Sequence, residues 1–189
     1  MRIESDALSS AGRAAHDAGL AAMLGGNLFG RLAMHPALES VSDASERGRV
    51  VNRAWTRYGI VNSTSLAALL AGWAGARTNE AHPRWLSPRE RVLARAKDVA
   101  MAAVVVTGAA AAVEGMRFSR MQPEGAVPLA DGSHPGPYTP PEAARLKRRL
   151  NRLSTAAIAS ELALLATNAS LGQANFRRPP LRRLLRRRY

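Results

Sequence analysis

Four long apolar blocks constrain this 189-residue chain more than any other feature of its sequence. The blocks lie at residues 18–34, 58–76, 99–116 and 153–176. Alanine, leucine and valine dominate them, and the strict apolar/polar alternation of a half-buried strand is almost absent, so the sequence predicts an all-α fold. Helices of these lengths match the roughly 30 Å hydrocarbon core of a bilayer. We therefore expect a four-helix transmembrane bundle.

The expected helices begin outside the apolar blocks. Ser87 and Glu90, on either side of Pro88, have the spacing of a capping box, in which side chain and backbone exchange hydrogen bonds. Thr139 and Glu142 repeat this pattern before the last block. Helices that begin at these positions are longer than is usual in globular proteins. We expect them to extend beyond the bilayer.

A single four-helix membrane domain is expected over residues 1–176. Residues 119–142 interrupt it with a stretch rich in proline and glycine, which we interpret as a long, mobile loop. Residues 177–189 place leucines at helical spacing among arginines and predict a basic amphipathic tail. We expect the tail arginines to contact lipid headgroups, and they are Arg177, Arg178, Arg182, Arg183, Arg186, Arg187 and Arg188.

The charge balance is strongly basic, with 27 lysine and arginine residues against 14 acidic ones. Such a balance favours polyanionic partners, either a membrane surface or nucleic acid. The arginine runs adjoin apolar blocks, and residues 99–113 carry no charge on any side of a helix, unlike a surface helix of a soluble bundle. The partners we expect are therefore membrane lipids, above all anionic headgroups. A protein partner or a second copy of the chain is a further candidate, and nucleic acid is not expected.

The positive residues outside the blocks predict an orientation. More of them lie on the side of the two termini than on the opposite side. Positive residues favour the cytoplasmic face, where anionic lipids attract them. We expect a multi-pass protein of the cell inner membrane with both termini in the cytoplasm.

The sequence offers no pattern for a metal or a cofactor. Cysteine is absent, which excludes disulfides, cysteine-ligated zinc and iron–sulfur clusters. His35, His82 and His134 each precede a proline and lack the spacing of metal ligands. The paired Glu-x-x-His motifs of a di-iron bundle are also missing. We therefore expect neither a metal nor a cofactor.

Glu161 is the most informative ionisable residue because it lies well inside the last apolar block. An ionisable group at that depth faces the interior of a bundle and marks a candidate functional site. It is either a protonated carboxyl group that joins two helices or a group that relays protons or contacts a ligand. Its candidate partners are Asn27, Asn62, Thr107 and Asn168.

Two further pairs of residues are candidates for a site. Arg31 and Glu114 lie at similar depths near the outer ends of their blocks. They could form an ion pair, extend separately to the membrane surface, or form a polar site with Arg57 and Asn62. His16 and Asp98 lie just before their blocks at the opposite side, and His16 could act as an acid or a base with Asp98, since imidazole titrates near neutral pH. The alternative is that Asp98 stabilises a helix N-terminus and His16 lies at the level of the headgroups.

Several short motifs carry a resemblance to known membrane proteins. They are the His16-Asp17-x-Gly19 motif, the segment 26–31 (Gly-Asn-Leu-Phe-Gly-Arg) and the segment 51–55 (Val-Asn-Arg-Ala-Trp). The chain resembles uncharacterised small four-helix integral membrane proteins of GC-rich bacteria and, more distantly, the anthrone-oxygenase-like membrane family. The second resemblance implies a cofactor-free oxidation of a polycyclic aromatic within the bundle, and it assigns no catalytic residue.

Taken together, these features predict an integral inner-membrane protein that serves as an accessory or interaction subunit or binds a small hydrophobic molecule. Two alternatives stay open. One is a cofactor-free, oxygenase-like membrane enzyme that acts on a lipid-soluble aromatic, with Glu161 or His16 as its acid or base. The other is a soluble basic bundle that binds nucleic acid.

Overall fold

The computed structural model describes residues 2–79 and 81–176. The expected all-α fold is confirmed, because four long helices account for most of these residues. The long helices are α1 (Arg2–Phe29), α3 (Ala44–Thr78), α4 (Pro88–Ser119) and α5 (Pro141–Phe176). The shorter elements are the π turn Gly30–Met34, α2 (His35–Ala37) and the 3-10 turns Leu38–Ser40, Pro83–Trp85 and Pro123–Gly125. The predicted tail and its arginines lie outside the described residues.

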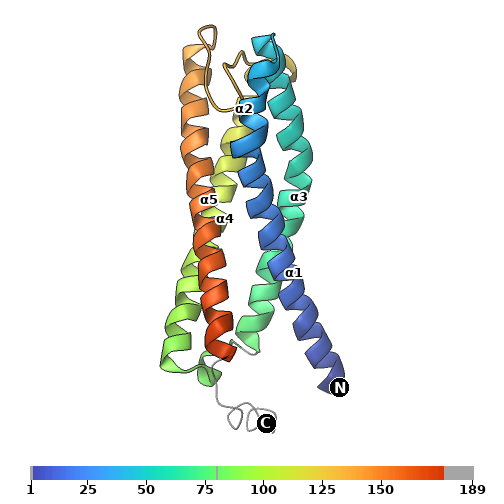
Figure 1. Cartoon of the computed structure of the whole chain (residues 1–189), viewed down its shortest axis with the longest axis vertical. Coiled ribbons are helices and arrows are strands. Elements are labelled where there is room, and N and C mark those ends of the chain that lie inside the picture. The colour runs from blue at the N-terminus through green and yellow to red at the C-terminus, as the bar shows by residue number, and fades with distance from the viewer. Residues whose placement is uncertain (1, 80, 177–189) are drawn as a thin grey trace.

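The four long helices lie side by side, and successive helices run in opposite directions (Figure 1). The start of α1, the end of α5 and residues 81–87 of the connection between α3 and α4 lie at one end of the bundle, which we call the termini end. Residues 38–43 and 120–140 lie at the opposite end, which we call the loop end. α1 runs without interruption through the π turn into α2, so these three elements form one rod.

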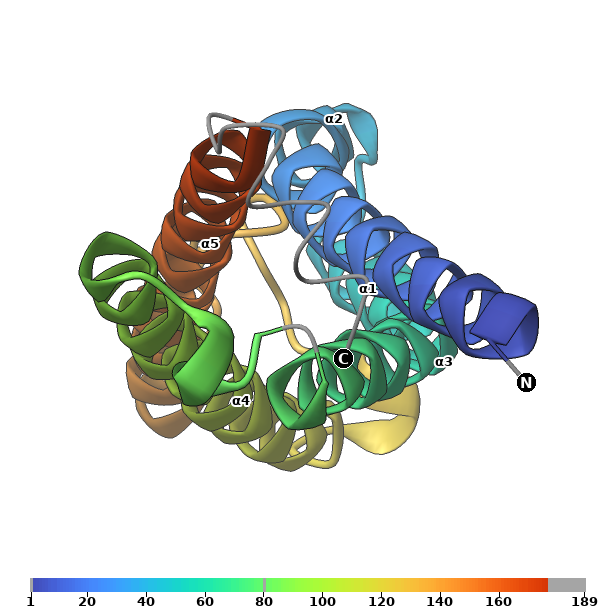
Figure 2. The ribbon, with the colours of Figure 1, turned by 90° about the horizontal axis from the view of Figure 1, so that it is seen from below.

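The helices form two close pairs. α1 packs along α3, and α4 packs along α5, whereas α3 and α4 touch only sparsely (Figure 2). Glycines allow the close approach of the first pair. A Cβ atom at Gly19 would lie 2.6 Å from the Ser65 carbonyl oxygen, and one at Gly72 would lie 2.4 Å from the Gly12 carbonyl oxygen. Larger residues at these positions would push the two backbones apart.

The helix starts follow the local signals in the sequence. At the start of α4, Ser87 accepts a hydrogen bond from the Glu90 N–H, and the Glu90 carboxylate accepts one from the Ser87 N–H. This exchange completes the predicted capping box. α5 begins at Pro141, next to the predicted start, and Asp43 caps α3 by accepting a hydrogen bond from the Ser45 N–H.

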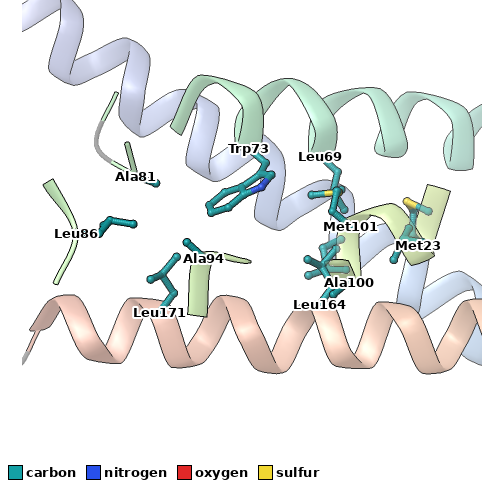
Figure 3. Packing of buried hydrophobic residues seen from close by; sticks show 12 residues of the cluster. Met23, Leu69, Trp73, Ala81, Leu86, Ala94, Ala100, Met101, Leu164 and Leu171 are labelled. Atoms are coloured by element: carbon teal, nitrogen blue, oxygen red, sulfur yellow. The ribbon is translucent and has the colours of Figure 1, made fainter. Parts of the chain in front are cut away.

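Two apolar clusters form the interior. The termini-end cluster draws on all four long helices, and Figure 3 shows Leu69 and Leu164 converging on Met101 from opposite sides. Its buried members are Leu20, Met23, Leu69, Trp73, Ala81, Leu86, Ala94, Ala100, Met101, Val104, Leu164 and Leu171. The loop-end cluster is smaller, and its buried members are Leu38, Val51, Phe118, Val127, Leu129 and Ala143.

The proline- and glycine-rich segment folds back over the loop end. Val127 and Leu129 are fully buried in the loop-end cluster. The Leu129 N–H donates to the Ala44 carbonyl at 3.0 Å, and the Arg47 guanidinium donates to the carbonyls of Leu129 and Ala130. These contacts, which composition alone does not reveal, anchor the segment to α3. Its mobility stays a prediction.

Large apolar side chains are also exposed along the long helices and the π turn that continues α1, as at Leu32, Ile60 and Leu162. On α4 they form one stripe, which we call the valine stripe, with members at intervals of seven residues: Val92, Val99, Val106 and Val113. Among the helices described, α4 is the one that is long and apolar enough to cross a membrane by length and composition. The sequence led us to expect four spans, and this finding supports one of them.

Candidate functional site

The middle of the bundle contains a buried carboxyl group, that of Glu161 on α5. The residue is 1% exposed. Its Oε1 accepts a hydrogen bond of 2.7 Å from Asn27 Nδ2 on α1. Its Oε2 is buried and has no hydrogen-bond partner among the described residues. Most buried polar atoms in proteins are hydrogen-bonded, so this oxygen requires an explanation.

α3 brings two more polar side chains to the same region. Tyr58 donates its hydroxyl hydrogen to the Ala22 carbonyl and lies close enough to Glu161 for an electrostatic interaction. The hydroxyl occupies the space above Gly26, where any Cβ atom would overlap it. Asn62 follows Tyr58 by four residues and lies on the same face of α3. Its Oδ1 is buried and, within the described part of the chain, also has no partner.

These polar groups lie where the apolar interior is interrupted. On α5, Glu161 lies between Leu146, which packs against the loop-end cluster, and Leu164 of the termini-end cluster. On α1, Asn27 lies just beyond Met23, the last member of the termini-end cluster on that helix. We call this region the central polar site, and its members are Asn27, Tyr58, Asn62 and Glu161.

The two unpartnered oxygens of the central polar site define what it can bind. The amide oxygen of Asn62 can only accept a hydrogen bond, whereas Oε2 of Glu161 accepts when the carboxyl is ionised and donates when it is protonated. A buried polar atom left without a partner costs about 1–3 kcal/mol. A hydroxyl group can donate to either oxygen, and it can accept from Oε2 when the carboxyl is protonated.

Only one of the four partners considered for Glu161 contacts it, and this is Asn27. Asn62 is part of the central polar site but forms no hydrogen bond to Glu161. Thr107 donates its hydroxyl hydrogen to a carbonyl of its own helix. Asn168 lies two turns farther along α5 and takes part in a different network. Counting residues along a helix therefore identified the candidate partners but not the one that makes contact.

A polar network at the termini end connects α1, α5 and α4. His16 Nδ1 donates to Asp17 Oδ1 at 3.0 Å, and Asn168 Nδ2 donates to the same oxygen at 3.0 Å. Lys97 Nζ donates to Asn168 Oδ1 at 2.6 Å and lies 4.0 Å from the centre of the Trp73 ring. Because a carboxylate can only accept, the proton of His16 is on Nδ1. His16 Nε2 is then a buried acceptor that lacks a partner among the described residues.

Asp98 has partners other than the one considered from the sequence. Its carboxylate accepts hydrogen bonds from Trp73 Nε1 at 2.8 Å and from Arg77 at 3.0 Å. His16 and Asp98 therefore do not form a pair, because His16 donates to the aspartate that follows it in the chain. Sequence reasoning also missed Lys97, whose pKa burial lowers to about 8. The one signal for it is its position two residues before an apolar block.

At the loop end, both ring nitrogens of His35 are bonded. Trp55 Nε1 donates to His35 Nε2 at 2.9 Å, and an indole N–H can only donate, so Nε2 carries no proton. The proton is on Nδ1, which donates to Ser133 Oγ at 2.8 Å. Burial lowers the pKa of His35 to about 4, which keeps it neutral at pH 7. In this arrangement His35 holds Ser133 in place and cannot activate it as a nucleophile.

Lys147 is the second buried lysine that the sequence did not reveal. The residue is 2% exposed, and its ammonium group lies 5.4 Å from the centre of the Phe118 ring. Burial lowers its pKa to about 8, and the nearby Asp131 partly opposes this shift. Asp131 itself accepts hydrogen bonds from the backbone N–H groups of Ser133 and His134. These contacts order the loop above α5.

Glu114 is buried near the end of α4 and is paired with arginines other than Arg31. Its carboxylate lies 3.1 Å from the guanidinium of Arg149 and 3.5 Å from that of Arg117. Arg31 forms no ion pair within residues 2–79 and 81–176, so the expected pairing of Arg31 with Glu114 is wrong. The reason is the order of the helices, because the close neighbour of α4 is α5 and not α1.

The residues around Glu114 line an open surface pocket of about 500 Å³ between α4 and α5. We call it the arginine pocket, and its lining residues are Glu114, Arg117, Met121, Glu142, Arg145, Leu146 and Arg149. For metal binding, the structure brings together no group of three or more histidine, aspartate or glutamate residues in the part of the chain that it describes.

Comparisons with known proteins found no match for this chain. No family model, no curated protein and no solved structure matches the chain. The resemblance to four-helix membrane proteins therefore stays an expectation, and the function is argued from the central polar site and the surface of the bundle.

Proposed function

We propose that the protein is a membrane-embedded four-helix bundle whose central polar site binds a small, lipid-soluble molecule that carries a hydroxyl group. The observation that carries this proposal is the pair of buried oxygens without partners, Oε2 of Glu161 and Oδ1 of Asn62. The membrane-spanning segments in this proposal are residues 18–34, 58–76, 99–116 and 153–176.

The distribution of apolar side chains supports the membrane location. The most apolar window of α4 is only 22% buried within the bundle, although the central helix of a soluble protein would be largely covered. In water, each fully exposed valine or leucine side chain forgoes about 1.5–3 kcal/mol that burial would supply. The interior, by contrast, contains carboxyl, amide and hydroxyl groups. Exposed apolar residues around buried polar ones are typical of a bundle in lipid.

The position of the central polar site supports a ligand that is mostly apolar and carries a hydroxyl group. The site lies in the middle of the bundle, between the two apolar clusters, and in the proposed placement this is the level of the bilayer interior. A ligand that reaches it from lipid must be mostly apolar. A hydroxyl group on such a ligand recovers the hydrogen bonds that Glu161 and Asn62 lack in the described structure.

The first test concerns the membrane location and uses the full chain in isolated membranes. We expect washes with high salt and with carbonate to leave the protein in the pellet and detergent to release it. Release by high salt alone would show a peripheral or nucleic-acid-bound protein, because salt weakens contacts between exposed charges. In that case the soluble basic bundle becomes the better description.

The second test concerns the ligand and compares 2-naphthol with 2-methoxynaphthalene, which has the same rings but no hydroxyl hydrogen. We expect 2-naphthol to raise the thermal midpoint of the detergent-solubilised protein more than its ether does. The variants Glu161→Leu and Asn62→Leu should remove this difference, whereas Glu39→Gln, at an exposed position outside the site, should keep it. Equal effects of both compounds on the unaltered protein would rule out hydrogen-bond recognition.

A second candidate function uses the same site. The motifs that carry the resemblance to the anthrone-oxygenase-like family include Asn27, Gly30 and Trp55, and these lie in or next to the central polar site, with the Trp55 ring packed on Gly30. This placement favours a cofactor-free oxidation of a polycyclic aromatic by dioxygen, in which a CH2 group becomes a carbonyl, one oxygen atom enters that carbonyl and the other leaves as water. Oxygen uptake in the presence of anthrone, compared between the unaltered protein and Glu161→Gln, separates catalysis from binding alone.

A further inference from the structure

The arginine pocket has a surplus of positive charge that is open to solvent. Three arginines and two glutamates line it. Glu114 lies beneath the surface at 3% exposure, and both of its oxygens are engaged by Arg117 and Arg149. Glu114 therefore acts as an internal support that holds these two guanidinium groups in position. Each guanidinium has five N–H donors, so both can still bind an anion.

Arg145 provides the third positive group of the pocket. It is exposed, and within residues 2–79 and 81–176 it forms no ion pair. Glu142 is the other acidic lining residue and lies at the exposed start of α5. The three arginines and two glutamates leave a net charge of one positive unit, which complements one phosphodiester. Arginine guanidinium groups are well suited to phosphate because they bind two of its oxygens at once.

The pocket is continuous with the exposed apolar surface of α4. Val113, the last member of the valine stripe, lies one helical turn before Arg117 and on the same face. Met116 is exposed beside them. From this end, the valine stripe continues along α4 toward the termini end. A ligand that joins a phosphate to a long apolar chain could therefore place its phosphate in the arginine pocket and its chain along the valine stripe.

We propose that the arginine pocket binds the phosphate group of an anionic phospholipid, whose acyl chain lies along the valine stripe. This inference rests on the proposed function, because a membrane location brings the pocket to the lipid–water boundary. An unattached phosphate ion would use the arginines but not the apolar stripe, whereas a phospholipid uses both. The site is distinct from the central polar site, which binds an uncharged molecule inside the bundle.

The test measures the thermal midpoint of the full chain in a neutral detergent while phosphatidylglycerol is added. We expect a saturable rise with phosphatidylglycerol and a much smaller one with phosphatidylcholine at the same mole fraction. The variant Arg145→Gln should raise the half-saturating mole fraction of phosphatidylglycerol by about three- to ten-fold, as expected when one charge-assisted contact is lost. Val113→Ser should raise it by a smaller factor.

The matched control is Arg148→Gln, which removes the same charge from the same exposed stretch of α5 but outside the pocket. Its half-saturation should equal that of the unaltered protein. Equal losses in both variants would show that lipid is attracted by overall charge, and no loss in either would show that the pocket does not bind it. Both outcomes overturn the inference.

Glycerol phosphate separates the lipid from a free phosphate compound. If millimolar glycerol phosphate raised the thermal midpoint as much as phosphatidylglycerol does, the ligand would be a soluble phosphate compound. The assignment of a phospholipid would then be wrong. Membrane extraction is scored separately. A protein that requires detergent for release but does not distinguish phosphatidylglycerol from phosphatidylcholine keeps the proposed function and loses this inference.

Discussion

The two ends of the bundle bury the same kinds of residue but complete their hydrogen bonds to different degrees. Each end contains a buried histidine and a buried lysine near a tryptophan and an aspartate. At the loop end, both ring nitrogens of His35 are bonded, to Trp55 and Ser133. At the termini end, His16 uses only one nitrogen, and the other has no partner among the described residues.

This difference shows that residue type alone does not identify a functional position. The histidine at the loop end is bonded to α3 through Trp55 and to the folded segment through Ser133, and its proton is fixed on one nitrogen. Within residues 2–79 and 81–176, no group bonds to the acceptor nitrogen of the histidine at the termini end. A complete network holds the structure together, whereas an incomplete one leaves an atom available for a ligand or a proton.

The largest effect is expected for His35→Leu. This change leaves the Trp55 N–H and the Ser133 hydroxyl without their partner inside the protein, and it weakens the attachment of the folded segment to α2. We expect a loss of about 2–4 kcal/mol in the free energy of unfolding. Denaturant unfolding of the detergent-solubilised protein measures it. A loss below 1 kcal/mol would show that the loop end is no more dependent on its histidine than the termini end is.

An intermediate effect is expected from pH. The pKa of His35 in the folded protein is about 4, below its ordinary value of 6.5. Between these values the unfolded chain binds more protons than the folded chain, so stability is full above pH 6.5 and is lost as the pH falls toward 4. The thermal midpoint measured from pH 7 to pH 4.5 should therefore fall more steeply in the unaltered protein than in His35→Leu. Parallel curves would contradict the assignment of a neutral, buried His35.

The smallest effect is expected for His16→Leu. His16 loses only its hydrogen bond to Asp17, whose carboxylate is largely exposed, and the unpartnered Nε2 is replaced by carbon. We expect a change of less than about 1 kcal/mol in the free energy of unfolding, measured as for His35→Leu. If His16→Leu lowered the free energy of unfolding as much as His35→Leu does, the two ends would depend equally on their histidines, which would contradict this comparison.

Local signals in the sequence predicted the helices well. Ser87, Pro88 and Glu90 define the start of α4 within four residues of chain, so no distant contact was needed to recognise it. The interior position of Glu161 also followed from local reasoning, because an ionisable residue in an apolar block is costly when it faces lipid. Such inferences depend on composition and spacing along one helix.

Pairings between helices were not predictable in the same way. Arg31 and Glu114 were matched by depth, but depth says nothing about which helices are neighbours, and α5 supplied Arg149 instead. Nothing in the sequence distinguishes Lys97 and Lys147 from the other basic residues around them. Their burial depends on how Trp73, Phe118 and the helices around them pack, and this arrangement exists only in the folded protein.

The π turn at Gly30–Met34 changes the helical phase of the first rod. A turn that contains one extra residue rotates everything after it by about 100° relative to an unbroken α-helix. Asn27 lies before this turn and reaches Glu161 on α5, whereas His35 lies after it and reaches Trp55 on α3. In an unbroken α-helix the eight residues from Asn27 to His35 would turn the two side chains about 80° apart, and the extra residue reduces this angle to about 20°. The length of this one turn therefore sets the angle between the two contacts.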